Sequence, residues 1–268
     1  MPALTAQMIL PLFVPADRPD RVAKAASAGA DAIIVDLEDA VAPDARKAAR
    51  AGLAEALASI ECPIVLRINA AGTQWHKADL AAAATLPLTA FMLAKAEDGE
   101  ACAHVARAVG VPVIALVETA RGIANLNSIA GASARLAFGS IDYAADLGMG
   151  HTRASLAAAR SALVLAARLA GQPAPLDGVT TAIRDAAMIE DDCRHAVEMG
   201  MGGKLIIHPA QLKAARRGFA PSQDELDWAA RVLKAAEGGA AVQMDGAMID
   251  APVIARAKAL LARAESDA

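Results

Sequence analysis

Eight short apolar runs recur along this chain, and they constrain its fold more than any other feature. Most of them end on a polar or charged residue, and the stretches between them are long enough for helices. Regular alternation of buried strands with helices is typical of a (β/α)8 TIM barrel. In that fold the residues at the carboxyl ends of the strands build the active site. We therefore expect one site assembled from several strand ends.

The position of each run predicts a strand. The runs lie at residues 9–14, 32–35, 63–66, 91–94, 112–117, 136–138, around 179 and at 205–207. Helical spacing and breaker residues between them predict helices from 19 to about 30, from 43 to about 59, from 142 to about 170 and from 185 to 199.

The chain of 268 residues suits one large barrel with an appendage. We expect the barrel to span residues 1–220, and residues 221–268 to form a helical and hairpin extension. Ser222 and Glu225 have capping-box spacing, and the Asp-Gly pair at 245–246 favours a hairpin turn. Because the extension has too little core to fold alone, we expect it to pack on its barrel or on a neighbouring subunit of a homo-oligomer.

Composition argues against several classes of partner. The net charge of −4 and the aromatic content of 3% do not suit nucleic-acid binding. The chain has no apolar run of 18 residues, and its start lacks the basic segment of a signal peptide. Three scattered cysteines suggest a reducing compartment. We therefore expect a cytoplasmic protein that binds neither nucleic acid nor a membrane.

Two carboxylates follow consecutive runs. Glu118 and Asp142 come after the fifth and sixth predicted strands, so both side chains should point into the same barrel mouth. Two carboxylates without a neighbouring His or Cys suit a hard cation that keeps several waters, namely Mg²⁺. Taken singly, each could instead be a solvated residue or a helix N-cap.

Further charged residues follow the first three runs. Asp36 and Glu38 belong to an acidic cluster that needs a metal or a basic partner, unless it only marks an acidic helix start. Arg67 offers a fork for a carboxylate, or for an ion pair inside the barrel mouth. The basic residues Arg18, Arg21 and Lys24 suit phosphates or a solvated helix face. Lys95, Lys204 and His208 rank behind these candidates.

The order of seven motifs points to a family. Along the chain, the motifs follow one another in this order: LFVP with Arg18, VDLEDAV from 35, LRIN from 66, VETARG from 117, GSID from 139, IHPAQ from 207 and GAMIDAPV from 246. This set resembles the citrate lyase beta-subunit-like CoA-ester lyases of the HpcH/HpaI aldolase superfamily. The resemblance implies a TIM barrel with a C-terminal extension, assembled as a trimer or larger homo-oligomer.

The resemblance also implies a reaction, namely Mg²⁺-dependent cleavage of a carbon–carbon bond in a thioester such as citramalyl-, malyl- or citryl-CoA. The products are acetyl-CoA and a 2-oxo acid. Three alternatives stay open: an aldolase on free 2-oxo acids, a citrate lyase beta subunit that acts on an acyl-carrier thioester, and a non-catalytic subunit that binds a CoA ester or oxo acid. Departures from the family pattern at Ile141, Ala94 and Ala182 bear on the acyl group.

Site roles follow from the same resemblance. Glu118 and Asp142 match the Mg²⁺ ligands, and Arg67 matches the arginine that grips the substrate carboxylate. Asp36 and Glu38 match acids near the metal-bound waters, and Asp36 is expected to be catalytic. A catalytic aspartate, which the extension can deliver to a neighbouring subunit, corresponds to Asp250. The thioester and CoA portion is expected to enter past Phe13, Arg18 and Lys24.

Overall fold

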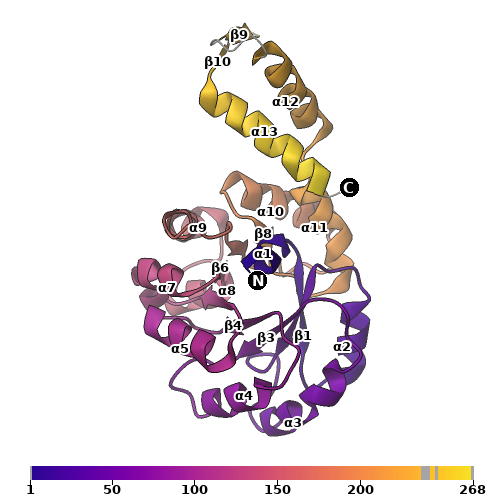
Figure 1. Cartoon of the computed structure of the whole chain (residues 1–268), viewed down its shortest axis with the longest axis vertical. Helices are drawn as coiled ribbons and strands as arrows, with labels where there is room; N and C mark the ends of the chain where they lie inside the picture. The colour runs from indigo at the N-terminus through magenta and orange to yellow at the C-terminus, as the bar shows by residue number, and fades with distance from the viewer. Residues whose placement is uncertain (1, 237–241, 245–246, 267–268) are drawn as a thin grey trace. The chain divides into compact units, whose positions relative to one another are not determined.

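An eight-stranded parallel sheet forms the centre of the protein in the computed structural model, which describes residues 2–236, 242–244 and 247–266. Neighbouring strands pair in sequence order from β1 to β8 (Figure 1). The strands are β1 Pro11–Pro15, β2 Ala32–Asp36, β3 Ile64–Ile68, β4 Ala90–Leu93, β5 Val113–Val117, β6 Arg135–Phe138, β7 Leu176–Asp177 and β8 Gly203–Lys204.

The sheet closes on itself between its last and first segments. Ile206 forms a parallel bridge with Leu12, and the Phe13 N–H donates to the Ile206 carbonyl at 2.8 Å. The predicted (β/α)8 barrel is therefore confirmed. Closure matters for the site because it brings the carboxyl ends of all eight strands to one mouth.

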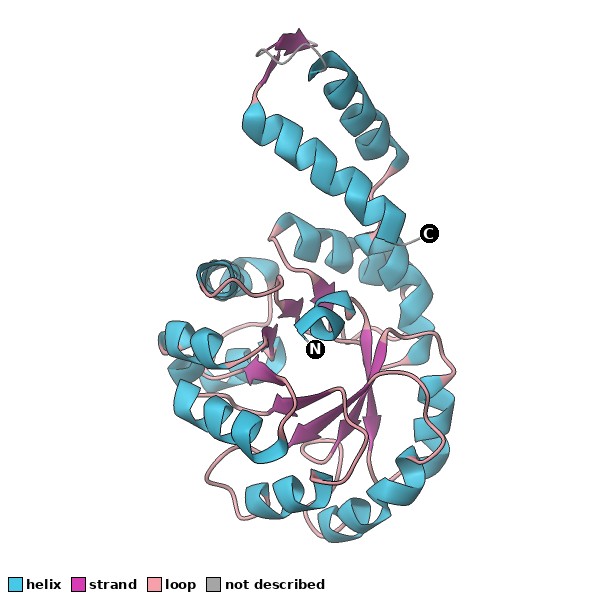
Figure 2. Ribbon diagram, viewed as in Figure 1, coloured by secondary structure: helices cyan, strands magenta, loops and turns pink. Residues whose placement is uncertain are grey.

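Helices surround the strands of the barrel (Figure 2). They are α1 Pro2–Gln7, α2 Pro19–Ala26, α3 Arg46–Leu57, α4 His76–Ala83, α5 Gly99–Val109, α6 Ala120–Ala124, α7 Leu126–Ala132, α8 Ser140–Asp146, α9 Arg153–Leu169, α10 Ala186–Glu198 and α11 Leu212–Phe219. Local signals in the sequence set several of their starts. Pro19 opens α2 at its first position, and the Asp185 carboxylate caps α10 through the Met188 N–H.

Apolar side chains fill the barrel interior. Every residue of β2, β3 and β5 is buried, as expected for parallel strands covered on both faces. At the amino-terminal end of the barrel, the buried Arg135 guanidinium donates to the carbonyl oxygens of Thr5, Met8, Ala174 and Gly202. Burial lowers the pKa of Arg135 to about 10. Buried Arg135 thus satisfies backbone carbonyls at the end of the barrel opposite the predicted site.

Three predicted elements differ from the structure. The seventh and eighth strands begin earlier than predicted, at Leu176 and Gly203. Each strand is only two residues long, and the apolar residues that predict it lie just after its end. The predicted helix over 142–170 is two helices, α8 and α9. Gly148 adopts a positive φ of 64° after α8, and Thr152 then caps α9 by accepting a hydrogen bond from the Ser155 N–H.

Residues Arg216–Ala268 form a second compact unit, while Met1–Ala215 form the first. The second unit contains α12 Gln223–Ala235, the antiparallel pair β9 Val242–Met244 and β10 Ala247–Ile249, and α13 Ala251–Ser266. The predicted capping box is confirmed, since Ser222 Oγ accepts from the Glu225 N–H at 3.2 Å. The pairing of β9 with β10 confirms the hairpin, whose turn residues 245–246 lie outside the described residues.

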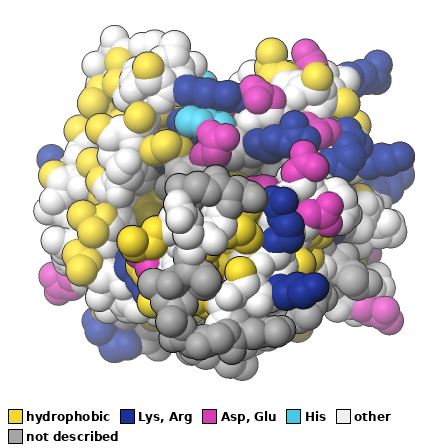
Figure 3. All heavy atoms as spheres, turned by 90° about the horizontal axis from the view of Figure 1, so that it is seen from above, with side chains coloured by type: hydrophobic (Ala, Val, Ile, Leu, Met, Phe, Trp, Pro, Cys, Tyr) yellow, Lys and Arg dark blue, Asp and Glu magenta, His cyan; other side chains and the backbone are white. Residues whose placement is uncertain are grey.

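Charged residues of both signs reach the surface. Lys and Arg side chains lie among Asp and Glu side chains on the face shown in Figure 3, as the nearly balanced composition predicts. No helix among the described residues combines the length and the apolar character needed to cross a membrane.

Candidate active site

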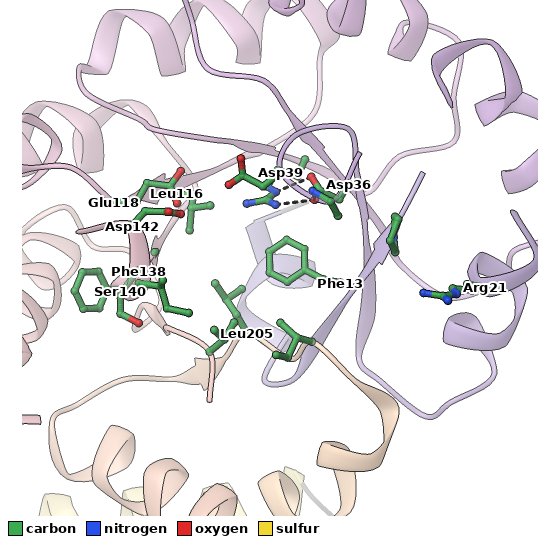
Figure 4. A pocket seen from close by; sticks show the side chains of 17 residues that line it. Phe13, Arg21, Asp36, Asp39, Leu116, Glu118, Phe138, Ser140, Asp142 and Leu205 are labelled. Atoms are coloured by element: carbon green, nitrogen blue, oxygen red, sulfur yellow. Dashed lines mark hydrogen bonds and ion pairs between the residues drawn. The ribbon is translucent and has the colours of Figure 1, made fainter. Parts of the chain in front are cut away.

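A cavity of about 470 Å³ opens at the carboxyl ends of the strands. Figure 4 shows the residues that line it, which come from the ends of several different strands. They are Phe13, Pro15, Arg21, Asp36, Asp39, Ala40, Arg67, Leu116, Glu118, Phe138, Gly139, Ser140, Ile141, Asp142, Val179, Leu205 and Ile207. The barrel therefore brings together five residues that the resemblance assigns to the site: Phe13, Asp36, Arg67, Glu118 and Asp142.

Arg67 is fixed by Asp36, which is the last residue of β2. The Arg67 Nε and Nη2 atoms donate to the two Asp36 carboxylate oxygens at 2.7 and 2.6 Å. The same oxygens also accept from the N–H groups of Glu38 and Ala40, both at 2.9 Å. Four donors satisfy this carboxylate, so the geometry favours a role for Asp36 in positioning Arg67 rather than in moving a proton.

Glu38 connects Arg67 to a lysine. One Glu38 oxygen lies 3.1 Å from Arg67 Nη1, and the other accepts from Lys95 Nζ at 2.5 Å. Burial raises the pKa of Glu38, although the Arg67 charge opposes that effect. Burial alone would lower the pKa of Arg67, but the charges of Asp36, Glu38 and Glu118 hold it above its ordinary value. Arg67 is thus a permanent cation in a fixed orientation.

Lys95 has a second contact, through its backbone. Its N–H donates to Glu118 Oε1 at 2.7 Å. Its φ of 46° is the only positive value recorded for a non-glycine residue among the described residues. Such a conformation is uncommon for a side-chain-bearing residue, and it commonly occurs at functional sites. From the sequence Lys95 is a weaker candidate than Glu118, although it follows β4 by two residues much as Glu118 follows β5.

Glu118 is almost fully buried, and its charge has no direct ion-pair partner among the described residues. Burial is the largest cause of a rise in its pKa to about 8, which the nearby Arg67 charge only partly offsets. The described residues donate a hydrogen bond to Oε1 but none to Oε2. A buried carboxylate in this state gains stability from a bound cation.

Asp142 lies in the first turn of α8, directly after β6, and is half-buried. Figure 4 shows it next to Glu118 on one side of the cavity. Its carboxylate has no hydrogen-bond donor within the described part of the chain. Two free carboxylates at one cavity wall fit a hard, oxygen-preferring cation such as Mg²⁺. No group of three or more His, Cys, Asp or Glu residues that could hold a metal occurs among the described residues, so waters or substrate would supply the other ligands.

Gly139 makes room for the side chain of Glu118. A Cβ atom at residue 139 would lie 2.3 Å from Glu118 Oε2 and 2.4 Å from Glu118 Cβ. Gly139→Ala should therefore displace Glu118 and weaken Mg²⁺ binding about 10- to 100-fold, as expected when a ligand loses its orientation. Isothermal titration calorimetry would measure this. Gly52→Ala, on the open surface of α3, is the matched control and should bind Mg²⁺ normally. Unchanged affinity in Gly139→Ala would contradict this account.

The Glu118 pKa predicts how stability depends on pH without metal. The folded protein holds a proton on Glu118 up to about pH 8, whereas the ordinary value is 4.5. Between these pH values the folded state binds more protons, so the free energy of unfolding should fall as pH rises. Denaturant unfolding in EDTA at pH 5 and pH 8.5 should show a fall of a few kcal/mol that is absent in Glu118→Gln. Parallel pH curves for the two proteins would contradict the prediction.

A basic pocket adjoins the cavity. Its volume is about 520 Å³, and its lining includes Arg18, Arg21 and Lys24 from the start of α2. Phe13 lines both the cavity and this pocket, and its ring packs under the Arg67 guanidinium at 4.8 Å. The structure therefore places the three residues predicted for the thioester and CoA portion, Phe13, Arg18 and Lys24, around one pocket.

Asp250 belongs to the second unit. It is exposed and precedes α13, where its Oδ1 accepts from the Val253 N–H at 3.3 Å. This contact is the helix N-cap that the sequence suggests on its own. Both residues of this contact belong to the second unit. The catalytic role of Asp250 stays a prediction.

The fold and the site together define a metal-using barrel enzyme, and comparison with known proteins identifies its family. The family model described as HpcH/HpaI aldolase/citrate lyase matches residues 10–209. The chain belongs to this family. The predicted family and the predicted class of Mg²⁺-dependent lyase are therefore confirmed.

Individual relatives resemble the chain over nearly all of its length. A citrate lyase subunit beta-like protein of Mycobacterium tuberculosis is 40% identical over 263 residues, which cover 94% of each chain. A (3S)-malyl-CoA thioesterase of Cereibacter sphaeroides is 36% identical over 269 residues, covering 95% of this chain and 94% of its own. The crystal structure of M. tuberculosis CitE with magnesium, acetoacetate and coenzyme A has a TM-score of 0.86 at 38% identity and covers 96% of this chain and 98% of its own.

Proposed function

We propose that this protein cleaves, or forms, a 3-hydroxyacyl-CoA thioester that carries a carboxylate on C3, such as citramalyl-, malyl- or citryl-CoA. The products are acetyl-CoA and a 2-oxo acid. One observation carries the proposal: two free carboxylates and a fixed arginine share a cavity that adjoins a basic pocket. The solved relative that contains magnesium, acetoacetate and coenzyme A supports it.

Glu118 and Asp142 would hold Mg²⁺. When bound there, the ion supplies Lewis acidity to the oxygens of the oxo-acid half, an effect of several kcal/mol in such sites. Arg67 would bind the C3 carboxylate through the N–H groups that Asp36 and Glu38 leave free. Because its orientation is fixed before substrate enters, little conformational entropy is lost on binding.

The basic pocket would bind the other end of the substrate. Arg18, Arg21 and Lys24 are exposed, and their charges suit the phosphates of CoA. Phe13 lies at the boundary between this pocket and the cavity, which is where the thioester would lie. The two adjoining spaces thus match a substrate with a charged carrier at one end and a small hydroxy acid at the other.

The reaction breaks the bond between C2 and C3 of the acyl group. The C3 hydroxyl gives its proton to a general base, such as a water molecule, and becomes the carbonyl of the oxo acid, while the electron pair of the broken bond forms the enolate of acetyl-CoA. A general acid must then protonate C2. We propose Asp250 for this step, supplied by the second unit of the same chain or of a neighbouring subunit in a homo-oligomer, which the family resemblance suggests to be a trimer.

Release of acetyl-CoA tests the proposal. The purified protein would be incubated with citramalyl-, malyl- and citryl-CoA in Mg²⁺ and then in EDTA, and products would be separated by chromatography. Release that EDTA abolishes supports the lyase. If no CoA ester is cleaved but a free hydroxy acid or an acyl-carrier thioester is, the function is that of an aldolase or of a citrate lyase beta subunit.

Thioester hydrolysis is a second candidate, which the similarity to a (3S)-malyl-CoA thioesterase favours. The same incubation separates it from cleavage. Hydrolysis yields free CoA thiol and the intact hydroxy acid, whereas lyase action yields acetyl-CoA and an oxo acid.

Asp250→Asn should lower kcat by about 10²- to 10⁴-fold, the range for loss of a general acid, and leave the Kd for Mg²⁺ unchanged. Asparagine retains an N-cap, so α13 should still form. Asp185→Asn, which changes the N-cap of α10 in the same way, is the control and should keep its activity.

Mixing Asp250→Asn with Arg67→Ala protein tests where the aspartate acts. If a neighbouring subunit supplies it, mixed oligomers contain some complete sites and activity returns. Full activity of Asp250→Asn alone would remove Asp250 from the mechanism.

A further inference from the structure

Few positive charges face the cavity beside Glu118 and Asp142. Of the described residues that line it, only Arg67 and Arg21 are cationic. Figure 4 shows Arg21 beyond the Phe13 ring from Glu118 and Asp142, and Arg21 also lines the basic pocket. Lys95 is not among the residues that line the cavity, and its Nζ is paired with Glu38. Arg67 is therefore the cation available to the oxo-acid half of a substrate.

Arg67 has capacity for one carboxylate. A guanidinium has five N–H groups. Two of them donate to Asp36, and Nη1 is paired with Glu38. The two that remain can form one fork, which binds a single carboxylate.

A second substrate carboxylate would meet negative charge. Asp36, Asp39, Glu118 and Asp142 line the same cavity. Arg67 and a divalent cation together carry fewer positive charges than these four carboxylates carry negative ones, so a second substrate carboxylate finds no unpaired cation. A carboxylate that is desolvated without a partner binds weakly.

The remaining wall is mostly apolar, and its one hydroxyl among the described residues, that of Ser140, is already bonded to His151 Nε2 at 2.9 Å. Leu116, Phe138, Val179, Leu205 and Ile207 line the cavity together with Ile141, a residue that is 43% exposed. Figure 4 shows Leu116, Phe138 and Leu205 around the space next to Glu118 and Asp142. Such a wall favours an alkyl substituent over a hydrogen atom or a charged group.

We infer that this site selects a substrate whose oxo-acid half has one carboxylate and a small alkyl group. The released acid is then a 2-oxo monocarboxylate of the pyruvate type, and the preferred thioester is of the citramalyl type rather than the citryl or malyl type. This inference rests on the proposed function and narrows its substrate class.

Two measurements test the inference. In the first, kcat/KM is compared for cleavage of citramalyl-, malyl- and citryl-CoA. Citramalyl-CoA should exceed malyl-CoA by about 10- to 200-fold, the range for one methyl group in an apolar pocket, and citryl-CoA by at least about 100-fold. In the second, calorimetry at saturating Mg²⁺ should show pyruvate binding at least about tenfold more tightly than oxaloacetate.

A charge added to the rim should change the preference. Ile141→Lys places a cation at an exposed position, so folding should be unaffected, and it should reduce the preference for pyruvate over oxaloacetate at least about tenfold. Leu165→Lys adds the same charge at an exposed position of α9 outside the cavity lining and should keep the binding ratio.

The outcomes separate this inference from the proposed function. Citryl-CoA cleaved as fast as citramalyl-CoA, or oxaloacetate bound as tightly as pyruvate, would overturn the inference and leave the lyase intact. Tight, selective binding of pyruvate without cleavage of any thioester would support the inference and overturn the proposed reaction.

Discussion

Glu118→Gln should abolish high-affinity Mg²⁺ binding and lower kcat/KM for thioester cleavage by about 10³-fold, equivalent to about 4 kcal/mol of transition-state stabilisation. Glutamine has nearly the same shape and can still accept the Lys95 N–H, so the barrel should fold normally. The neutral amide removes the charge that a divalent cation needs. Calorimetric titration with Mg²⁺ and acetyl-CoA release would measure the two effects.

The control for this substitution is a carboxylate away from the cavity. Glu55→Gln changes an exposed residue on the outer helix α3 and should leave both Mg²⁺ binding and turnover unchanged. If Glu118→Gln binds Mg²⁺ as tightly as the unmodified protein, the metal is held elsewhere and the proposed reaction loses its main support.

Arg67→Lys should lower kcat/KM by about 10²-fold or more, chiefly through a higher KM for the thioester. Lysine keeps the positive charge but loses the planar fork that joins Asp36 to a substrate carboxylate. Arg67→Ala should also destabilise the protein by about 3–5 kcal/mol, because Asp36 and Glu38 would be left buried without their cation. Steady-state kinetics and denaturant unfolding would measure both quantities.

Arg135→Lys is the control that distinguishes an effect of Arg67 on substrate binding from an effect on protein stability. Arg135 is equally buried but donates to backbone carbonyls at the opposite end of the barrel. Its replacement should lower stability and leave KM unchanged. If Arg67→Lys and Arg135→Lys lose the same activity for the same loss of stability, Arg67 has only a structural role.

Much of the fold was predictable because parallel strands covered on both faces have to be apolar throughout. β2, β3 and β5 were found for this reason, since each is a continuous buried run that ends on a polar residue. The predicted positions of β7 and β8 lie a few residues after the observed strands, because a two-residue strand is too short to show a hydrophobic pattern of its own. The split between α8 and α9 depends on the cap at Thr152, a signal that the surrounding alanines obscured.

The site was only partly predictable. The structure places Glu118 and Asp142 in one cavity, as expected because neighbouring strand ends share one mouth, and their role as metal ligands stays a prediction. The contacts of Asp36 and Lys95 could not be predicted from their positions at strand ends. Asp36 contacts a residue 31 positions away, and Lys95 reaches Glu38 across 57 positions. Such contacts follow from barrel closure rather than from local sequence.

The sequence by itself determined the barrel, the family and the set of charged groups at the strand ends, because hydrophobic periodicity and motif order are properties of the chain. Tertiary structure alone decided which of those charges are already satisfied. Asp36 and Glu38 are paired with Arg67 and Lys95, whereas Glu118 Oε2 and Asp142 have no donor within the described residues. The physical reason is that a buried carboxylate is free to bind a cation only where the folded chain brings no donor of its own to it.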